Sequence, residues 1–256
     1  AARIPGNLYD SKCKKMAVAD YLLRNFAKQL ERYSFQAHGS GKSGIIQVTR
    51  CGQEVLERTA CEIEEKTGNI IVRFEVGFPA RGRTIQAGEL IKILYQYLPA
   101  CVEKALYYKN MDQNAVKRAA ELAVDQEYIR EQLKKEGLIA FVADGSILPR
   151  ESGVSQRPMK DAVPFVSPDS MKVTMKLPYK GVLTGMGIRK GITLVVGGGY
   201  HGKSTLLKAL ESGVYPHIAG DGREYVVTDD TAMKIRAEDG RSIRHKDISM
   251  FINDLP

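Results

Sequence analysis

Apolar residues recur at helical spacing in three segments of the chain. Residues 14–32 place apolar side chains three or four positions apart, with charged residues opposite them, which predicts an amphipathic helix. Residues 112–136 repeat this pattern, and Gly137 stands where a helix commonly ends. Residues 89–108 predict a third helix, interrupted near Pro99 because proline lacks the backbone N–H that a helix interior uses.

Short apolar runs and period-two alternation predict strands in much of the remaining chain. Residues 70–76 alternate between two faces and follow a Lys-Thr-Gly-Asn turn, so we expect them to form a hairpin with residues 55–65. The other predicted strands are residues 45–49, 138–143, 172–177, 179–184, 192–196, 225–228 and 233–235. This mixture of helices and strands indicates an α/β protein.

A proline-rich segment separates two parts of the predicted structure. Residues 149–170 contain four prolines together with glycine and serines, a composition typical of a linker or an extended loop. We therefore expect an N-terminal α+β accessory domain in residues 1–148 and a second domain in residues 171–256.

A glycine-rich run matches the phosphate-binding motif G-x-x-x-x-G-K-[ST]. It consists of Gly197, Gly198, Gly199, Tyr200, His201, Gly202, Lys203, Ser204 and Thr205. The predicted strand 192–196 precedes the run, and a helix with leucines on one face is expected to follow it. Glycines let the backbone fold around an anion, Lys203 supplies a positive charge for the terminal phosphates, and Ser204 is the expected Mg²⁺ ligand. The pattern predicts a nucleoside triphosphate site; the alternative is a glycine-rich turn with an incidental lysine.

The formal net charge of +8 is unevenly distributed along the chain. Residues 1–50 carry nine Lys/Arg against three Asp/Glu, and residues 151–200 carry seven against three. This asymmetry permits an acidic partner such as RNA, and it is equally compatible with a solvated surface. No stretch approaches the ~18 consecutive apolar residues of a membrane span, and no secretory signal is visible, so we expect a soluble protein with no membrane partner.

Three basic residues and one aromatic residue are further binding candidates. Lys42 lies in a Gly/Ser loop, and Arg81 and Arg83 lie in a turn after the predicted hairpin, where they can contact the phosphates of single-stranded RNA. A flexible linker and solvated surface arginines are the alternatives. Tyr179, 18 residues before the glycine run, is the candidate for stacking on adenine, with Phe165 as the alternative.

Several strings in the chain resemble the predicted ABC-class ATPases, a family outside the transporters. They are residues 39–44, 141–145, 183–188, 219–224 and 235–242, together with the glycine run. The resemblance extends over nearly the whole chain from about Lys15 onward. It implies an α/β fold in which the first part of an ABC-type P-loop ATPase domain follows an α+β accessory domain. It also implies a homodimer that encloses ATP and Mg²⁺, with Lys203 as a catalytic residue.

The family includes a mitochondrial RNA-editing factor of trypanosomes that joins an ABC-type ATPase core to an RNA-binding pore. The lysine- and tyrosine-rich sequence of this chain is similar to that member, which implies RNA binding, RNA editing or processing, and a mitochondrial location. The alternatives are a cytoplasmic ABC-class ATPase that acts on a protein partner and a regulatory nucleotide-binding module. A small-molecule kinase would also use the glycine run, but no acceptor-substrate site is visible.

The later motifs of ABC-type ATPases are expected beyond this sequence. The family carries a signature loop, an Asp-Glu strand end and a switch histidine well after the glycine run, whereas only 53 residues follow Lys203. We therefore interpret the chain as part of a longer ATPase. Hydrolysis of ATP is expected of the complete protein, because positioning of water and stabilisation of the transferring phosphoryl group need those parts.

Overall fold

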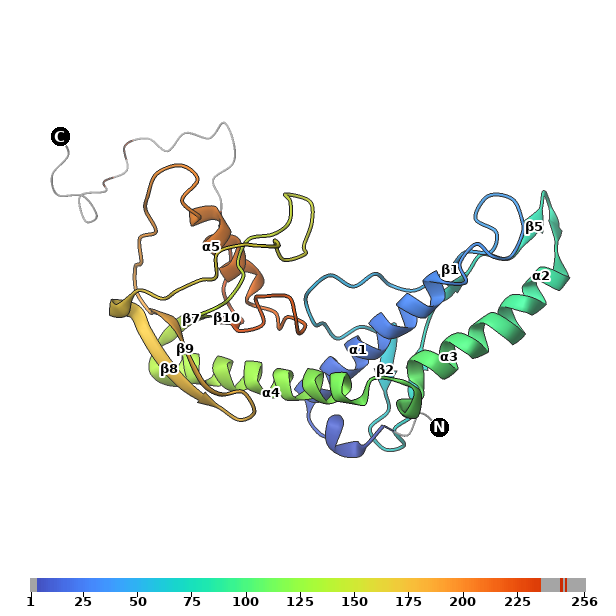
Figure 1. Ribbon diagram of the computed structural model, residues 1–256, viewed down its shortest axis with the longest axis horizontal. Coiled ribbons are helices and arrows are strands. Elements are labelled where there is room, and N and C mark those ends of the chain that lie inside the picture. Colours follow the sequence, from blue (N-terminus) through green and yellow to red (C-terminus); the bar gives the residue numbers. More distant parts are fainter. Residues whose placement is uncertain (1–3, 236–244, 246, 248–256) are drawn as a thin grey trace.

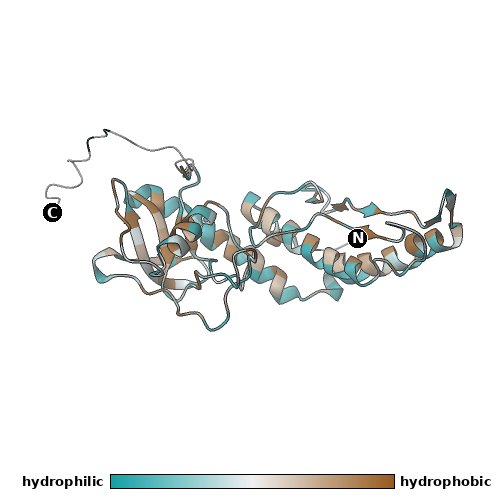
Figure 2. Cartoon of the chain, turned by 90° about the horizontal axis from the view of Figure 1, so that it is seen from above, coloured by the Kyte–Doolittle hydropathy of each residue, from teal (hydrophilic) through white to brown (hydrophobic). Residues whose placement is uncertain are grey.

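The computed structural model describes residues 4–235, 245 and 247. The molecule is elongated, with a helical N-terminal part at one end and a four-stranded sheet at the other (Figures 1 and 2). A long helix, α4, extends from one part into the other (Figure 1).

The N-terminal part is built around α1 (Lys12–Glu31). Ser11 begins this helix by accepting a hydrogen bond from the Lys14 backbone N–H at 3.4 Å. A second helical rod runs antiparallel to α1. It consists of α2 (Ala87–Lys92), a π-helical segment (Ile93–Tyr97) and α3 (Leu98–Leu106). Pro99 lies in the first turn of α3, directly after the π-helical segment, so the predicted interruption near Pro99 is confirmed.

Short antiparallel strand pairs complete this part. They are β1 (Ile46–Gln47) with β4 (Glu75–Val76), β2 (Cys61–Ile63) with β3 (Ile70–Val72), and β5 (Ala80–Arg81) with β6 (Thr84–Ile85). The β2–β3 pair confirms the predicted hairpin, although both strands are shorter than the alternating pattern. Its side chains close a core in which Val18, Leu22 and Phe26 of α1 are fully buried.

Helix α4 (Gln113–Glu136) connects the two parts. Asp112 caps its first turn by accepting from the Ala115 backbone N–H at 3.0 Å. Gly137 ends it with φ = +66°, a left-handed conformation that glycine adopts without steric cost. The N-terminal half packs against α1, and the C-terminal half packs against the sheet.

The sheet is fully antiparallel, with the strand order β10-β7-β9-β8. Its strands are β7 (Leu138–Ala143), β8 (Lys172–Leu177), β9 (Gly181–Arg189) and β10 (Val226–Thr228). Phe141 and Leu138 pack with α4 on one face, whereas Val142 packs with α5 (Lys203–Ser212) on the other. The result is a helix–sheet–helix sandwich, which confirms the predicted α/β class.

The proline-rich segment 149–170 connects β7 to β8 within this one sheet. The expected boundary therefore has strands of the same sheet on both sides, because β7 hydrogen-bonds to β9 and β10 across it. The structure thus places α4 and β7 with the C-terminal part of the chain.

Two predicted strands are wrong. Residues 192–196 form no strand, and Ile192, Leu194 and Val196 are 72%, 65% and 80% exposed. Residues 233–235 are likewise irregular and exposed. An apolar run becomes a strand only where a neighbour accepts its backbone hydrogen bonds, and no described strand lies beside either segment.

Candidate nucleotide-binding site

The glycine run forms an exposed loop that leads into the N-terminus of α5. Gly197 and Gly202 have φ values of +149° and +79°, which strain residues with a side chain. Tyr200 is also left-handed, with φ = +61°, and its side chain is fully exposed. A non-glycine residue in this conformation is uncommon, and such strain often marks a functional loop.

Lys203 folds back into this loop. Its ammonium donates hydrogen bonds to the carbonyl oxygens of Gly197, at 2.5 Å, and of Gly198. The loop therefore encircles a positive charge at the start of α5.

The N-terminus of α5 adds further hydrogen-bond donors. Its cap residue, Gly202, has no side chain to accept from the first turn, and its carbonyl accepts the Leu206 N–H, at 2.9 Å. Within the described residues, the backbone N–H groups of Lys203, Ser204 and Thr205 have no acceptor. Together with the helix dipole, these groups can donate hydrogen bonds to an anion. The Ser204 side chain is exposed beside them.

Tyr179 does not lie near this loop. It occupies the turn between β8 and β9, where its backbone N–H donates to Asp125 of α4 at 2.9 Å. The nine residues of β9 run away from that turn for about 30 Å before the glycine loop begins. The alternative, Phe165, lies in the core with Leu206 and Leu210 of α5, so it packs behind the helix.

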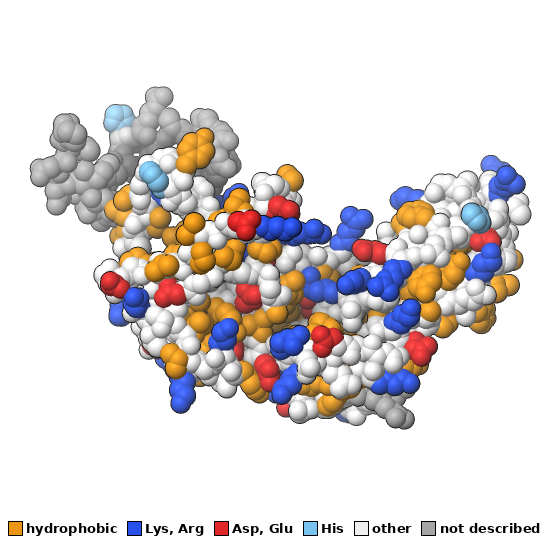
Figure 3. Space-filling view, viewed as in Figure 1, with side chains coloured by type: hydrophobic (Ala, Val, Ile, Leu, Met, Phe, Trp, Pro, Cys, Tyr) orange, Lys and Arg blue, Asp and Glu red, His pale blue; other side chains and the backbone are white. Residues whose placement is uncertain are grey.

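The three basic candidates meet at the opposite end of the molecule, in what we call the basic tip (Lys42, Arg81 and Arg83). The Gly/Ser loop is fixed to β5 because Ser40 N–H donates to the Ala80 carbonyl at 2.8 Å and Ala80 N–H donates to Ser43 Oγ at 3.0 Å. All three side chains are exposed. Figure 3 shows Lys and Arg side chains at this end, where β5 lies in Figure 1.

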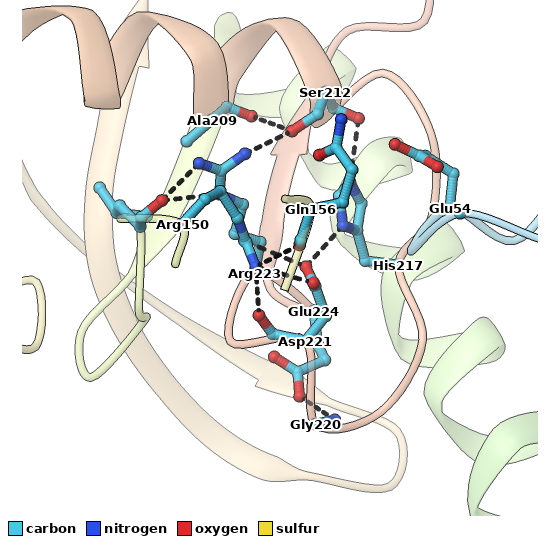
Figure 4. A network of polar contacts seen from close by, with 12 residues as sticks. Glu54, Arg150, Gln156, Ala209, Ser212, His217, Gly220, Asp221, Arg223 and Glu224 are labelled. Atoms are coloured by element: carbon cyan, nitrogen blue, oxygen red, sulfur yellow. Dashed lines mark hydrogen bonds and ion pairs between the residues drawn. The ribbon is translucent and has the colours of Figure 1, made fainter. Parts of the chain in front are cut away.

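A buried polar network near the end of α5 was not predicted. The Asp221 carboxylate is completely buried and accepts hydrogen bonds from Arg150 Nη1, at 2.9 Å, and from Arg150 Nη2, at 3.2 Å (Figure 4). His217 Nδ1 lies 2.7 Å from the same carboxylate. The available signal in the sequence was an Asp between two glycines, Gly220 and Gly222, both of which adopt a positive φ in the structure.

Arg223 extends the network to α5 itself. Its guanidinium donates to the Leu148 carbonyl at 3.0 Å and to Ser212 Oγ at 3.2 Å, and Ser212 is the last residue of α5 (Figure 4). Burial lowers the pKa of Arg223 to about 10, because the charged form loses its water. The network therefore anchors the C-terminal end of the helix whose N-terminus carries the glycine loop.

The N-terminal part attaches beside this network. Val55 N–H donates to the Pro216 carbonyl at 2.7 Å, and Ile218 N–H donates to the Gln53 carbonyl at 3.0 Å. Arg24 of α1 holds the same segment through the carbonyls of Gly52 and Glu54, at 2.6 and 3.0 Å. Residues 52–55 thus connect α1 to the loop that follows α5.

A glycine loop that surrounds a lysine at an uncapped helix N-terminus defines a P-loop nucleotide-binding protein. Residues 112–256 match the P-loop domain of the ABC ATPases, and residues 1–109 match the N-terminal region of ATPases of the ABC class. The chain therefore belongs to the ABC-class ATPases, which confirms the family resemblance. The boundary between the two matched regions lies just before the first residue of α4 in the sequence.

One curated relative is an uncharacterized protein of Methanocaldococcus jannaschii, 29% identical over 173 residues. The match covers 64% of this chain and 38% of that protein. The chain therefore spans little more than a third of the relative's length. Among the described residues, no helix has both the length and the hydropathy needed to cross a membrane.

Proposed function

We propose that this protein binds ATP and ADP at the glycine loop and acts as part of an ABC-class ATPase. The observation that supports this most directly is the Lys203 ammonium, enclosed by the loop carbonyls beside the free amides of α5. Phosphate oxygens would replace these carbonyls as partners of Lys203, and the amides of Ser204 and Thr205 would donate to them.

The exposed Ser204 hydroxyl could serve as a Mg²⁺ ligand at the same site, since Mg²⁺ prefers oxygen ligands and is commonly coordinated by the phosphates of the nucleotide as well. The metal would supply charge neutralisation of the phosphates. We further propose that two copies of the complete protein close around the nucleotides and that the complete protein hydrolyses ATP.

Replacement of Lys203 tests the nucleotide site. Lys203→Ala should weaken binding of ATP at least about tenfold, because it removes a charge-assisted phosphate contact. Lys208→Ala is the matched control, since Lys208 lies on the same helix and is exposed. Titration calorimetry with Mg²⁺ and ATP measures both. Unchanged affinity in Lys203→Ala would show that ATP binds elsewhere.

We also propose that the basic tip binds the phosphates of single-stranded RNA, so that nucleotide-driven closure acts on RNA editing or processing. The support is geometric: residues 40–43 and the β5–β6 hairpin, distant in sequence, are held together by backbone contacts. Lys42, Arg81 and Arg83 form no ion pair with other described residues, so their charges remain available. The proposed compartment is the mitochondrion for an RNA-editing factor and the cytoplasm otherwise.

The salt dependence of RNA binding tests this second proposal. Replacing Lys42, Arg81 and Arg83 together by Gln should weaken binding of single-stranded RNA. It should also reduce the slope of log affinity against log salt concentration by about two, since each phosphate contact contributes about 0.7. A triple variant of Lys117, Lys134 and Lys135 is the control, because these lysines are about 60% exposed on α4. No RNA binding by the parent protein at low salt would refute the proposal.

A protein partner is the second candidate for this end of the molecule. Phe35, Phe78 and Tyr95 are 60%, 55% and 75% exposed there, and exposed aromatic side chains are frequent at protein interfaces. Binding of such a partner would survive the triple Gln substitution and depend less on salt.

A further inference from the structure

A cavity of about 380 Å³ lies between α1, α4 and the loop that follows α5. Neither the glycine loop nor the basic tip contributes to it. Ala17 of α1 and Ala115 and Ala119 of α4 face it, and larger side chains at these positions would fill it. Its volume falls within the roughly 300–1,000 Å³ of small-molecule sites.

The wall of this cavity is mainly apolar. Val55 and Leu122 are buried there, and Ile218 covers a further side. An apolar wall favours a ligand with a hydrocarbon or aromatic body, because the ligand and the wall both lose contact with water. The ring of Tyr21 adds an aromatic surface from α1.

The rim carries positive charge that the described acids balance only weakly. The Lys28 ammonium and the Asn25 amide form no hydrogen bond or ion pair with any described residue. The Arg118 side chain is 61% exposed, and its guanidinium lies 3.6 Å from the Asp112 carboxylate, which makes a weak surface ion pair. Asp20, the acid among the described residues of the wall, is already neutralised by Arg24 and by Arg58.

We propose that this cavity binds a small aromatic anion, with its ring against the apolar wall and its acidic group beside Lys28 and Arg118. Such a ligand would touch α1, α4 and residues 217–219 at once. It would therefore bridge the two regions matched by the ABC-class families and hold the loop after α5 against the N-terminal part (Figure 1).

The probe for this site is 8-anilinonaphthalene-1-sulfonate, an aromatic sulfonate whose fluorescence rises in apolar surroundings. The parent protein should bind one equivalent saturably. Ala119→Phe should abolish that binding by filling the cavity, and Lys28→Gln should weaken it about tenfold, the effect of one charge-assisted hydrogen bond. Lys117→Gln, on the other face of α4, should leave it unchanged.

Circular dichroism establishes that each variant is folded, and Lys28→Gln remains informative if Ala119→Phe does not fold, because Lys28 is a surface residue. Lys203→Ala should bind the probe like the parent, which separates this site from the nucleotide loop. Saturable binding that persists in folded Ala119→Phe, or that is equally strong in Lys28→Gln, would overturn the proposal. Absence of saturable binding by the parent would overturn it as well.

Discussion

Asp221 is the residue at which the buried charges around α5 converge. Its side chain has no exposed surface and faces Arg150 and His217 directly. Removing one partner from a buried ionic group leaves the others without compensation, which is far more costly than loss of a surface pair.

We expect Asp221→Ala to lower the free energy of unfolding by about 3–5 kcal/mol, because Arg150 would remain buried without its acid. Asp230→Ala is the control, since Asp230 is 49% exposed and lies 3.6 Å from Lys134; its cost should stay below about 1 kcal/mol. Urea denaturation followed by circular dichroism measures both. Equal effects of the two substitutions would refute a structural role for the network.

At this scale the sequence singled out the loop residues as candidates but gave no indication of the buried polar ones. Lys203 was identifiable because the phosphate motif fixes both residue type and spacing. Asp125 and Gln126 lie on the buried side of α4, and nothing in their spacing distinguishes them from a solvated face. Their partners, Tyr179 and His217, come from segments more than 50 residues away. The same long-range contact explains why Tyr179 lies away from the glycine loop.

At the scale of elements, the predictions were accurate where local signals agreed. The ends of α4 were correct within one residue, because Asp112 and Gly137 satisfy backbone groups within the same helix. The strand predicted at residues 192–196 was wrong for the opposite reason. Their apolar side chains favour a strand, but a strand also needs a neighbour in space, which a local pattern does not provide.

Asp125 makes the contact between α4 and the β8–β9 turn dependent on pH. Its carboxylate accepts the N–H groups of Tyr179 and Lys180 at 2.9 and 2.8 Å, yet burial raises its pKa above the usual 3.8. Between that value and the raised pKa, the folded protein binds more protons than the unfolded chain. The raised pKa therefore stabilises the folded protein fully at pH values below the usual pKa of Asp. This stabilisation is lost as the pH rises through the raised pKa of Asp125.

Asp125→Asn should remove this dependence, because the amide does not titrate. The free energy of unfolding of the variant relative to the parent should therefore increase as pH rises from about 4 to about 7. Parallel urea titrations across this range test the prediction, with Glu131→Gln as an exposed control on the same helix. A relative stability that decreases with pH would reverse the sign and contradict the inferred pKa direction.

At the scale of the whole molecule, the two parts share structural elements instead of meeting at a flexible linker. Helix α4 packs against α1 at one end and supplies Ile129 and Leu133 to the core of the sheet at the other. Residues 52–55 add hydrogen bonds to the loop after α5. The proline-rich segment suggested a boundary by composition alone, whereas pairing of strands across it depends on contacts between distant residues.

This shared helix predicts cooperative unfolding. Loss of the sheet would expose one half of α4, and loss of the N-terminal core would expose the other, so neither part should unfold without destabilising its neighbour. Urea unfolding should therefore give coincident transitions by far-ultraviolet circular dichroism and by tyrosine fluorescence. Arg24→Ala, which removes the hydrogen bonds from α1 to the carbonyls of Gly52 and Glu54 together with the ion pair to Asp20, should weaken this coupling and broaden or separate the transitions. The control Lys28→Ala lies one turn further along α1 and should leave them coincident. Two separate transitions in the parent protein would mean that α4 belongs energetically to one part only.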